Sequence, residues 1–399
     1  MPSSITDIRK LERTQKVMLG FSFLSFITLG LHEGSMGVAW PSIRGNFGLP
    51  LDFLGMILVA STFGVLVTSF NSGWFLARAE FGALLVIANL IRAAGLFGYV
   101  LAPAWWVMIA GAFLVGLGSG TIDSGMNTFV ATRYGPGPLN WLHAFYGLGA
   151  MVSPLIMSAL IANSLNWRLG FVLIGCVQIL LALYFARELK CWPSSLLYNQ
   201  GEDFEEKKVS SVNTLGLVAV WMGITVFFLS TGIEITVGQW SFSLFTEARG
   251  ESVTLAGFWV SFFWGSLAAG RILFGFITDR IGATRLLRFG FAGVIVGILL
   301  LWWNYVNLVG FIGVALIGFW IAPVFPVMIG LSPVRYGKEH AANAIGFQVA
   351  SAYLGGALIP ALVGITADAA GLEVIGLMLF IGGVLTIGTH ELLIRKCGY

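Results

Sequence analysis

Long apolar stretches joined by short polar connections dominate this sequence. The hydrocarbon core of a bilayer is about 30 Å thick, so a helix needs about 20 mainly apolar residues to cross it. We predict twelve such helices. They cover residues 17–43, 51–75, 82–102, 105–131, 139–163, 166–187, 214–242, 253–277, 284–304, 308–331, 342–367 and 373–394. The last two are rich in glycine, which membrane helices tolerate better than soluble ones.

The composition supports an all-α integral membrane protein. Of 399 residues, 57% are hydrophobic and only 10% are charged, and the mean hydropathy is +0.88. A soluble domain carries about 25% charged residues. The first apolar segment is too long for a cleavable signal peptide. We therefore predict a multi-pass protein of the cell inner (plasma) membrane.

The basic residues predict the orientation of the chain. Arg44, Arg168 and Arg249 fall on one side of the predicted spans, whereas Arg92 and Arg271 fall within them. The remaining basic residues fall on the other side: Arg9, Lys10, Arg13, Lys16, Arg78, Arg133, Arg187, Lys190, Lys207, Lys208, Arg280, Arg285, Arg288, Arg335, Lys338, Arg395 and Lys396. Because cytoplasmic loops carry the excess of Lys and Arg, both termini should be cytoplasmic. The net charge of +3 is then a sign of topology and does not indicate nucleic-acid binding.

A charged linker divides the chain into two halves. The longest polar stretch runs from residue 188 to 213 and contains GEDFEEKKVSS. It falls between the sixth and seventh predicted helices. We therefore predict one six-helix bundle over residues 1–187, a cytoplasmic linker over 188–213 and a second six-helix bundle over 214–399.

The two halves repeat each other at the same ordinal positions. The paired features are Gly30-Leu-His-Glu33 with Gly232-Ile-Glu234, Gly37…Trp40 with Gly238…Trp240, ATRYG ending at Gly135 with PVRYG ending at Gly337, and Gly149–Pro154 with Gly356–Pro360. Two parallel six-helix repeats, with a substrate site near the middle of the membrane, are the architecture of major facilitator transporters.

Asp123 is an acid in the middle of an apolar helix. An ionised carboxylate in hydrocarbon costs about 2.5 kcal/mol or more, so such an acid marks a functional site by default. Ser119 and Asn127 lie one turn to either side, on the same helical face. This polar stripe indicates contact with water, substrate or a coupling ion. The alternative is a structural carboxylate that pairs with Arg92 of the third helix.

One loop carries a family signature. Residues 275–285 read GFITDRIGATR, which resembles the motif G-x-x-x-D-R-x-G-R-R/K of the major facilitator family. In that family it occupies the cytoplasmic loops after helices two and eight. The resemblance implies a gating motif made of Gly275, Asp279, Arg280, Gly282 and Arg285, with Arg78 in the first half. Ala77 replaces the expected aspartate there, so that half of the gate must use other contacts.

Helices four and five resemble the fucose–proton symporter branch of this family, which includes fucose, glucose and galactose transporters. That branch has E-x-x-x-N-P-F-V in helix four, and this chain has Asp123-Ser-Gly-Met-Asn127-Thr-Phe-Val. In helix five, His143 stands where the branch has a glutamine. The resemblance implies that Asp123 takes up the coupling ion and that Asn127 and His143 lie on the substrate side.

Glu33 lies in the middle of the first predicted helix, and Glu234 lies within the seventh. We predict cation coupling by Asp123, Glu33 and Glu234. Gln239 shares a cavity with Glu234 only if the helix unwinds, for which Gly238 is the natural place. Arg271 should snorkel or pair with an acid. The candidate substrate-binding residues are Asn127, His143, Tyr146, Gln239, Trp240, Gln348, Asn89 and His32.

These features predict a secondary active transporter for a small polar solute, a sugar, driven by a proton or Na⁺. The alternative is a proton-coupled exporter of amphipathic drugs, since an aromatic cavity with acids also suits lipophilic cations. There is no P-loop, and GLGSG (116–120) lies inside a membrane helix without a preceding strand. The cysteines Cys176, Cys191 and Cys397 fit neither a disulfide framework nor a metal cluster. We expect a monomer in the bilayer that is not an enzyme and has no cofactor, no metal and no nucleic-acid partner.

Overall fold

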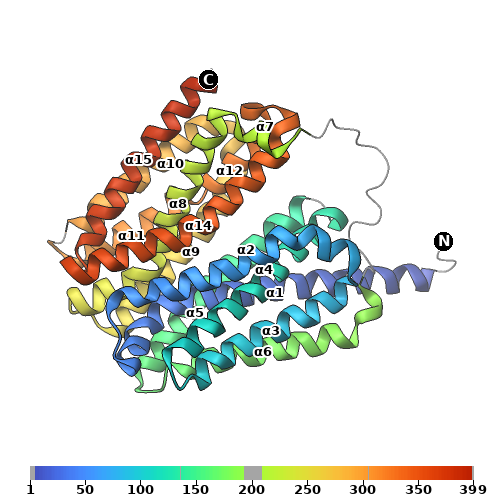
Figure 1. Ribbon diagram of the computed structural model, residues 1–399, viewed down its shortest axis with the longest axis horizontal. Helices are drawn as coiled ribbons and strands as arrows, with labels where there is room; N and C mark the ends of the chain where they lie inside the picture. The colour runs from blue at the N-terminus through green and yellow to red at the C-terminus, as the bar shows by residue number, and fades with distance from the viewer. Residues whose placement is uncertain (1–4, 135, 193–208, 304, 398–399) are drawn as a thin grey trace. The chain divides into compact units, whose positions relative to one another are not determined.

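The computed structural model describes residues 5–134, 136–192, 209–303 and 305–397, and these residues are almost entirely helical (Figure 1). The helices are α1 (Ile5–Phe47), α2 (Leu54–Arg78), α3 (Phe81–Leu101), α4 (Trp105–Tyr134), α5 (Pro136–Ala162), α6 (Arg168–Arg187), α7 (Ser211–Leu215), α8 (Val218–Ser243), α9 (Val253–Ile281), α10 (Ala283–Trp302), α11 (Asn307–Ile321), α12 (Val324–Gly330), α13 (Ser332–Tyr336), α14 (Lys338–Ala370) and α15 (Val374–Cys397). Short turns at Leu51–Phe53 (η1), Leu189–Cys191 (η2) and Leu244–Ala248 (η3) complete the described chain.

The described residues contain 12 helical spans long and apolar enough to cross a membrane. The predicted number of spans is therefore confirmed. The tenth span differs from the prediction because it consists of α11 and α12, with a break at Ala322 and Pro323. Proline removes a backbone hydrogen bond and clashes with the preceding turn, which explains the break. The seventh span begins at Val218, and residues 211–215 form the separate short helix α7.

Two glycines make the tightest helix connections. Gly282 is the single residue between α9 and α10, and Gly337 is the single residue between α13 and α14. Their φ angles are 87° and 88°, a region that residues with a Cβ rarely adopt. The sequence therefore needs glycine at both positions, and Gly337 ends the repeated RYG segment.

The chain forms two compact units. The first consists of residues 1–33, 63–150 and 168–202, and the second of residues 34–62, 151–167 and 203–399. The change from one unit to the other at residues 202 and 203 falls inside the predicted linker. The later parts of α1 and α5 and the first part of α2 belong to the second unit. The bundle boundaries read from the sequence stay a prediction.

In the first unit, α3 packs between α4 and α6 (Figure 1). Aromatic side chains of these helices form one end of the core, where Phe81, Phe129 and Phe185 surround Trp192. The ring centroids of Trp192 lie 5.0 to 5.7 Å from the three phenyl rings. Trp192 belongs to the predicted linker, so the first residues of that linker are part of the core of this unit.

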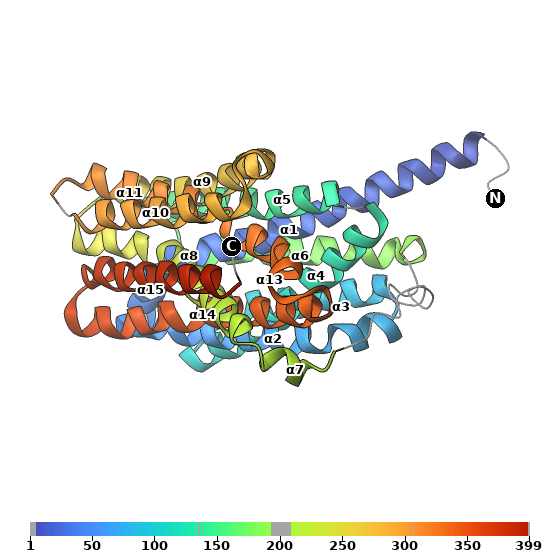
Figure 2. The same ribbon diagram turned by 90° about the horizontal axis from the view of Figure 1, so that it is seen from above.

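In the second unit, α8 packs against α14 and α15, and Figure 2 shows these helices side by side. The segment 34–62 is fixed to them by polar contacts. Asp368 accepts a hydrogen bond from the Leu51 amide at 2.9 Å, and Arg44 forms an ion pair with Glu247. The Trp40 indole donates to the Leu51 carbonyl at 3.2 Å. The later part of α1 is therefore firmly bound within this unit.

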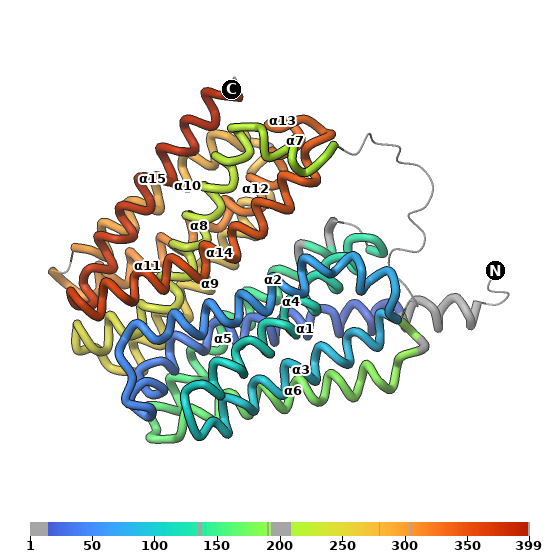
Figure 3. The backbone as a smooth tube through the Cα atoms, in the orientation of Figure 1, coloured from blue at the N-terminus to red at the C-terminus, as the bar shows by residue number. Residues whose placement is uncertain are grey.

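The end of the linker also has fixed contacts. Figure 3 shows α7 next to the beginning of α14. Thr214 of α7 is buried, and its hydroxyl lies 2.9 Å from Nδ1 of His340. The Asn343 amide donates to the Val209 carbonyl at 2.9 Å. These contacts anchor the linker to the second unit at Val209–Leu215.

The same close helix crossing occurs in both units. In the first, a Cβ at Gly30 of α1 would overlap the Tyr146 carbonyl of α5, and one at Gly149 would overlap the Ile27 carbonyl. In the second, a Cβ at Gly355 of α14 would overlap the Phe228 carbonyl of α8. Gly149 and Gly355 both stand five residues before a proline. The structural equivalent of Gly149 is thus Gly355, one residue before the Gly356 that the sequence comparison chose.

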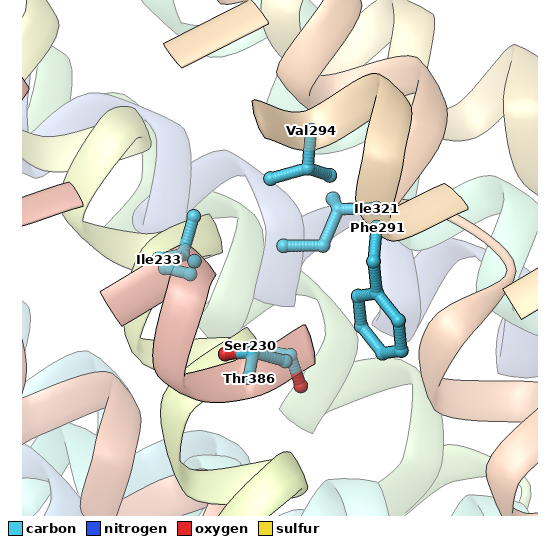
Figure 4. Close-up of a pocket in the computed structure, with 7 residues that line it drawn as sticks. Ser230, Ile233, Phe291, Val294, Ile321 and Thr386 are labelled. Atoms are coloured by element: carbon cyan, nitrogen blue, oxygen red, sulfur yellow. The ribbon is translucent and has the colours of Figure 1, made fainter. Parts of the chain in front are cut away.

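Figure 4 shows a small internal cavity of the second unit. It is lined by Ser230 and Ile233 of α8, Phe291 and Val294 of α10, Ile321, Gly383 and Thr386. Its volume is about 10 Å³, which is close to the minimum for one water molecule. Thr386 donates to the Gly382 carbonyl at 2.7 Å. The cavity is a packing gap that cannot hold a solute.

Valine at the crossing glycines should destabilise the protein. Gly30→Val and Gly355→Val would each push the two crossing helices apart. Such overpacking typically lowers the free energy of unfolding by about 1–3 kcal/mol. Gly20→Val in α1 and Gly346→Val in α14 are matched controls, since nothing lies within 4 Å of a Cβ there. Thermal unfolding in detergent should show lower midpoints for the first two variants only. Equal midpoints for Gly30→Val and Gly20→Val would show that the crossing does not limit packing.

Candidate functional site

Asp123 and Asn127 form a hydrogen-bonded pair on α4. The Asn127 amide donates to Oδ1 of Asp123 at 3.1 Å, across one helical turn. Both side chains are half-buried, as is Ser119 one turn earlier. The predicted stripe on one face of α4 is therefore present. The pair holds the carboxylate in a defined position within an otherwise apolar helix.

Arg92 of α3 lies at the centre of the polar groups in the first unit. It is completely buried, and its guanidinium donates to the Thr28 hydroxyl at 3.1 Å and to the Thr28 carbonyl at 2.8 Å. It also interacts electrostatically with Glu33 and Tyr146. Arg92 thus joins α3 to α1 and brings a positive charge near the acid of α1.

A buried polar layer surrounds Arg92. His32 stacks on Tyr99 with ring centroids 6.1 Å apart, and the Asn89 amide donates to the Leu85 carbonyl at 2.7 Å. Nε2 of His32, Oδ1 of Asn89, the Tyr99 hydroxyl and Nε of Arg92 have no hydrogen-bond partner among the described residues. Buried polar atoms normally have one, so this layer is suited to ordered water.

Gln178 of α6 belongs to the same layer and was not predicted. Its amide is fully buried, and neither amide atom has a hydrogen-bond partner among the described residues. Contacts of Gly175 with Phe97 and of Gly82 with Trp192 show that α3 and α6 run antiparallel. Gln178 therefore lies near the level of Arg92. The available signal was a single amide in an apolar helix, and it was overlooked together with Thr28 and Tyr99.

His143 and Tyr146 lie on α5. The His143 ring packs edge-on against Phe26 of α1, with centroids 5.5 Å apart, and is half-buried. Tyr146 is also half-buried, and its carbonyl faces Gly30. Both residues therefore lie along the contact between α1 and α5. The electrostatic interaction between Tyr146 and Arg92 connects Tyr146 to the polar layer.

In the second unit, Glu234 of α8 pairs with Arg271 of α9. The carboxylate and guanidinium lie 3.4 Å apart, and their side chains are 13% and 23% exposed. From the sequence we expected Arg271 either to snorkel or to pair with an acid. In the structure it pairs with Glu234. The charge of Glu234 is thereby balanced inside the helix bundle.

Gln239, Trp240 and Gln348 make packing contacts in this structure. The α8 helix continues through Gly238 without a break, so Gln239 and Glu234 lie on different faces. Gln239 is fully buried, and the Trp240 indole donates to the Pro360 carbonyl at 2.9 Å. Gln348 donates to the Tyr336 hydroxyl at 2.9 Å and accepts from Ser332 at 3.1 Å. The helix does not unwind at Gly238, which was the condition for Gln239 to share a cavity with Glu234.

The gating motif lies at the end of α9 and the start of α10. A Cβ at Gly275 would meet nothing within 4 Å. Arg280 and Arg285 are exposed, and the side chain of Asp279 lies outside the described residues. In the first half, the Arg78 guanidinium lies 5.1 Å from the centre of the Trp74 ring. The described part of the chain contains no group of three His, Cys, Asp or Glu side chains that could hold a metal ion.

Comparison with known proteins places these features in a family. Residues 21–360 match the protein family described as Major Facilitator Superfamily. The glucose/mannose transporter GlcP of Bacillus subtilis is 27% identical over 361 residues, which cover 86% of each chain. The nucleoside transporter NupG has a similar structure, with a TM-score of 0.78, 11% identity and coverage of 94% of this chain and 98% of NupG. The fucose transporter FucP, in its outward conformation, has a TM-score of 0.65 and 17% identity, and 95% of this chain and 99% of FucP are covered.

The match covers most of the sequence, so the chain belongs to the Major Facilitator Superfamily of transporters. The 12 spans and the bacterial relatives identify it as a multi-pass protein of the inner membrane.

Arg92 and Glu33 should stabilise the protein jointly. Arg92 is completely buried and donates two hydrogen bonds to Thr28, and leaving buried acceptors unsatisfied costs about 1–3 kcal/mol, so Arg92→Met should be destabilising. Adding Glu33→Gln should recover part of that loss, with a coupling of about 0.5–3 kcal/mol in a double-mutant cycle. Chemical unfolding in detergent measures both values. Glu80→Gln is the control, because Glu80 is exposed. Additive effects of Arg92→Met and Glu33→Gln would contradict an interaction between Arg92 and Glu33.

Proposed function

We propose that this chain transports a sugar across the membrane, coupled to the movement of a proton or Na⁺. The observation that carries the proposal is the Asp123–Asn127 pair, a carboxylate and an amide 3.1 Å apart in an apolar helix. Similarity to a glucose/mannose transporter over 86% of both chains supports a sugar as the solute. An uncharged, hydroxyl-rich solute also suits the amide, imidazole and phenol groups of the first unit.

Asp123 is our first candidate for coupling. An ionised aspartate only accepts hydrogen bonds, whereas a protonated one can also donate. Ion uptake therefore changes both the charge of the site and its bond to Asn127. Glu33 interacts electrostatically with Arg92, and Glu234 forms an ion pair with Arg271. We propose that these two acids contribute to coupling through these interactions.

For the substrate we propose contacts with Asn127, His143 and Tyr146. All three side chains are half-buried, so each is held in position by its neighbours and is still accessible to a solute. His32 and Asn89 are buried in the polar layer, and Gln239, Trp240 and Gln348 are buried in packing contacts. We propose that these five side chains stabilise the helix packing of their own units and do not contact the solute.

We propose alternating access with both termini in the cytoplasm and one chain as the working unit. The Arg44–Glu247 ion pair and the hydrogen bond from the Leu51 amide to Asp368 hold the segment 34–62 in place within the second unit. The excess of basic residues on the opposite side supports placing these contacts at the outer ends of the helices.

Sugars should stabilise the purified protein selectively. We expect glucose or one of its epimers to raise the thermal unfolding midpoint, because a ligand at 100 times its Kd stabilises by about 2.7 kcal/mol. The measurement is a thermal-shift series with hexose epimers, repeated at several pH values with and without Na⁺. Lipophilic cations form the comparison set. Stabilisation by these cations, and by no sugar, would favour the exporter of amphipathic drugs.

Asp123→Asn should uncouple transport from its ion gradient. In proteoliposomes, concentrative uptake should fall until the sugar merely equilibrates, while exchange of labelled for unlabelled sugar continues. The neutral amide keeps the shape of the side chain but cannot take up a proton. Asp52→Asn, at the turn before α2, is the control and should keep concentrative uptake. Undiminished accumulation by Asp123→Asn would remove this residue from the coupling step.

A further inference from the structure

One exposed face of α10 changes from basic to apolar along the helix. It begins with Arg285 and continues through Phe289, Ala292, Val296 and Leu299, at helical spacings of three or four residues. The three larger apolar side chains on it are 57%, 51% and 44% exposed. In a membrane protein, this face presents a charge at one end and a hydrocarbon surface beyond it.

A matching face runs along α15 in the opposite chain direction. Arg395 is exposed near its end, and Leu392, Gly388, Leu385 and Ile381 precede it on the same face. The Leu392 and Leu385 side chains are 54% and 53% exposed. A Cβ at Gly388 would meet nothing within 4 Å, so the surface there is open.

The two helices that carry these faces lie next to each other. Figure 1 shows α10 and α15 side by side, and the rings of Phe291 and His390 are 5.0 Å apart. A further contact joins Gly376 of α15 to Trp302 at the other end of α10, so the helices run antiparallel. Arg285 and Arg395 therefore lie at the same end. The small residues Ala292 and Gly388 lie at a common level between the larger side chains.

A fixed arginine lies between these two basic ends. Nε and Nη2 of Arg288 donate to the two carboxylate oxygens of Glu391 at 2.8 and 2.7 Å. The Arg288 side chain remains 51% exposed, and Glu391 also interacts electrostatically with Arg395. The Glu391 carboxylate thus orients Arg288 but does not balance the three positive charges of Arg285, Arg288 and Arg395.

We propose that the inner ends of α10 and α15 form a binding site for one anionic phospholipid. Its phosphate lies among Arg285, Arg288 and Arg395, and its acyl chains lie along the exposed apolar faces. Charge complementarity favours an anionic headgroup, since basic pockets between membrane helices on the cytoplasmic side bind such headgroups. The continuous hydrocarbon surface directly beyond the charges favours a lipid over a soluble anion. This site is independent of the proposed sugar transport.

Native mass spectrometry of the purified full chain tests the site. The probes are phosphatidylglycerol and phosphatidylcholine added to the detergent-solubilised protein. The wild-type protein should retain one phosphatidylglycerol and little phosphatidylcholine. Arg285→Gln/Arg395→Gln should weaken phosphatidylglycerol binding at least tenfold, because each basic side chain near an anionic lipid contributes about fivefold. Arg285→Lys/Arg395→Lys keeps the charge and should retain most of the binding.

The matched control is Arg133→Gln/Arg187→Gln, which removes two exposed basic residues from the first unit. It should change phosphatidylglycerol binding less than twofold. An equal loss in the control, unchanged binding by Arg285→Gln/Arg395→Gln, or equal retention of both lipids by the wild type would overturn the proposal.

Two measurements on the wild-type protein apply even if the glutamine variant does not fold. Raising the salt concentration should release phosphatidylglycerol, because exposed charges are screened beyond about 3 Å at 1 M salt. Millimolar inorganic phosphate should not release it. Release by phosphate at constant ionic strength would indicate a site for a soluble anion and would contradict the lipid assignment.

Discussion

Direct contact between helix backbones is the constraint on which the rest of each unit depends. At Gly30 and Gly149 in the first unit, and at Gly355 in the second, no side chain fits between the crossing helices. Small residues permit such approach in membranes, where association depends on van der Waals packing and not on a hydrophobic driving force. The first crossing lies one helical turn before Glu33, and the second lies about two turns before Glu234. The glycines therefore fix the depth at which both acids occur.

The two units place their charges differently around this shared crossing. Glu33 interacts with Arg92 of α3, whereas Glu234 pairs with Arg271 of α9, and these arginines come from spans that do not correspond in the repeat. Arg92 is completely buried and hydrogen-bonded to Thr28, whereas the Arg271 side chain is 23% exposed. A charge within a membrane span is costly unless it is paired, so each arginine has polar partners in the protein. The repeat preserves the helix packing while the charge pairs are specific to each unit.

The sequence predicted features that depend on neighbouring residues in the chain. The 12 spans follow from apolar length alone, and the Asp123–Asn127 contact follows from a spacing of four residues on one helix. The sequence could not predict which side chains meet across helices. Gln178 and Thr28 looked like isolated polar residues because their neighbours are distant in the chain. For the same reason, the sequence could not show that the Trp240 indole donates to the Pro360 carbonyl.

The sequence by itself determined the membrane class, the helical spans, the internal repeat and the candidate acids, because hydropathy and helical periodicity are local properties. Only the tertiary structure decided that Arg92 lies among α1, α3 and α5, that α8 stays continuous at Gly238 and that the crossing glycine is Gly355. It also decided that the later part of α1 belongs to the second unit. These outcomes depend on how the side-chain volumes and charges of segments distant in the sequence fit together. Local sequence patterns cannot predict such contacts.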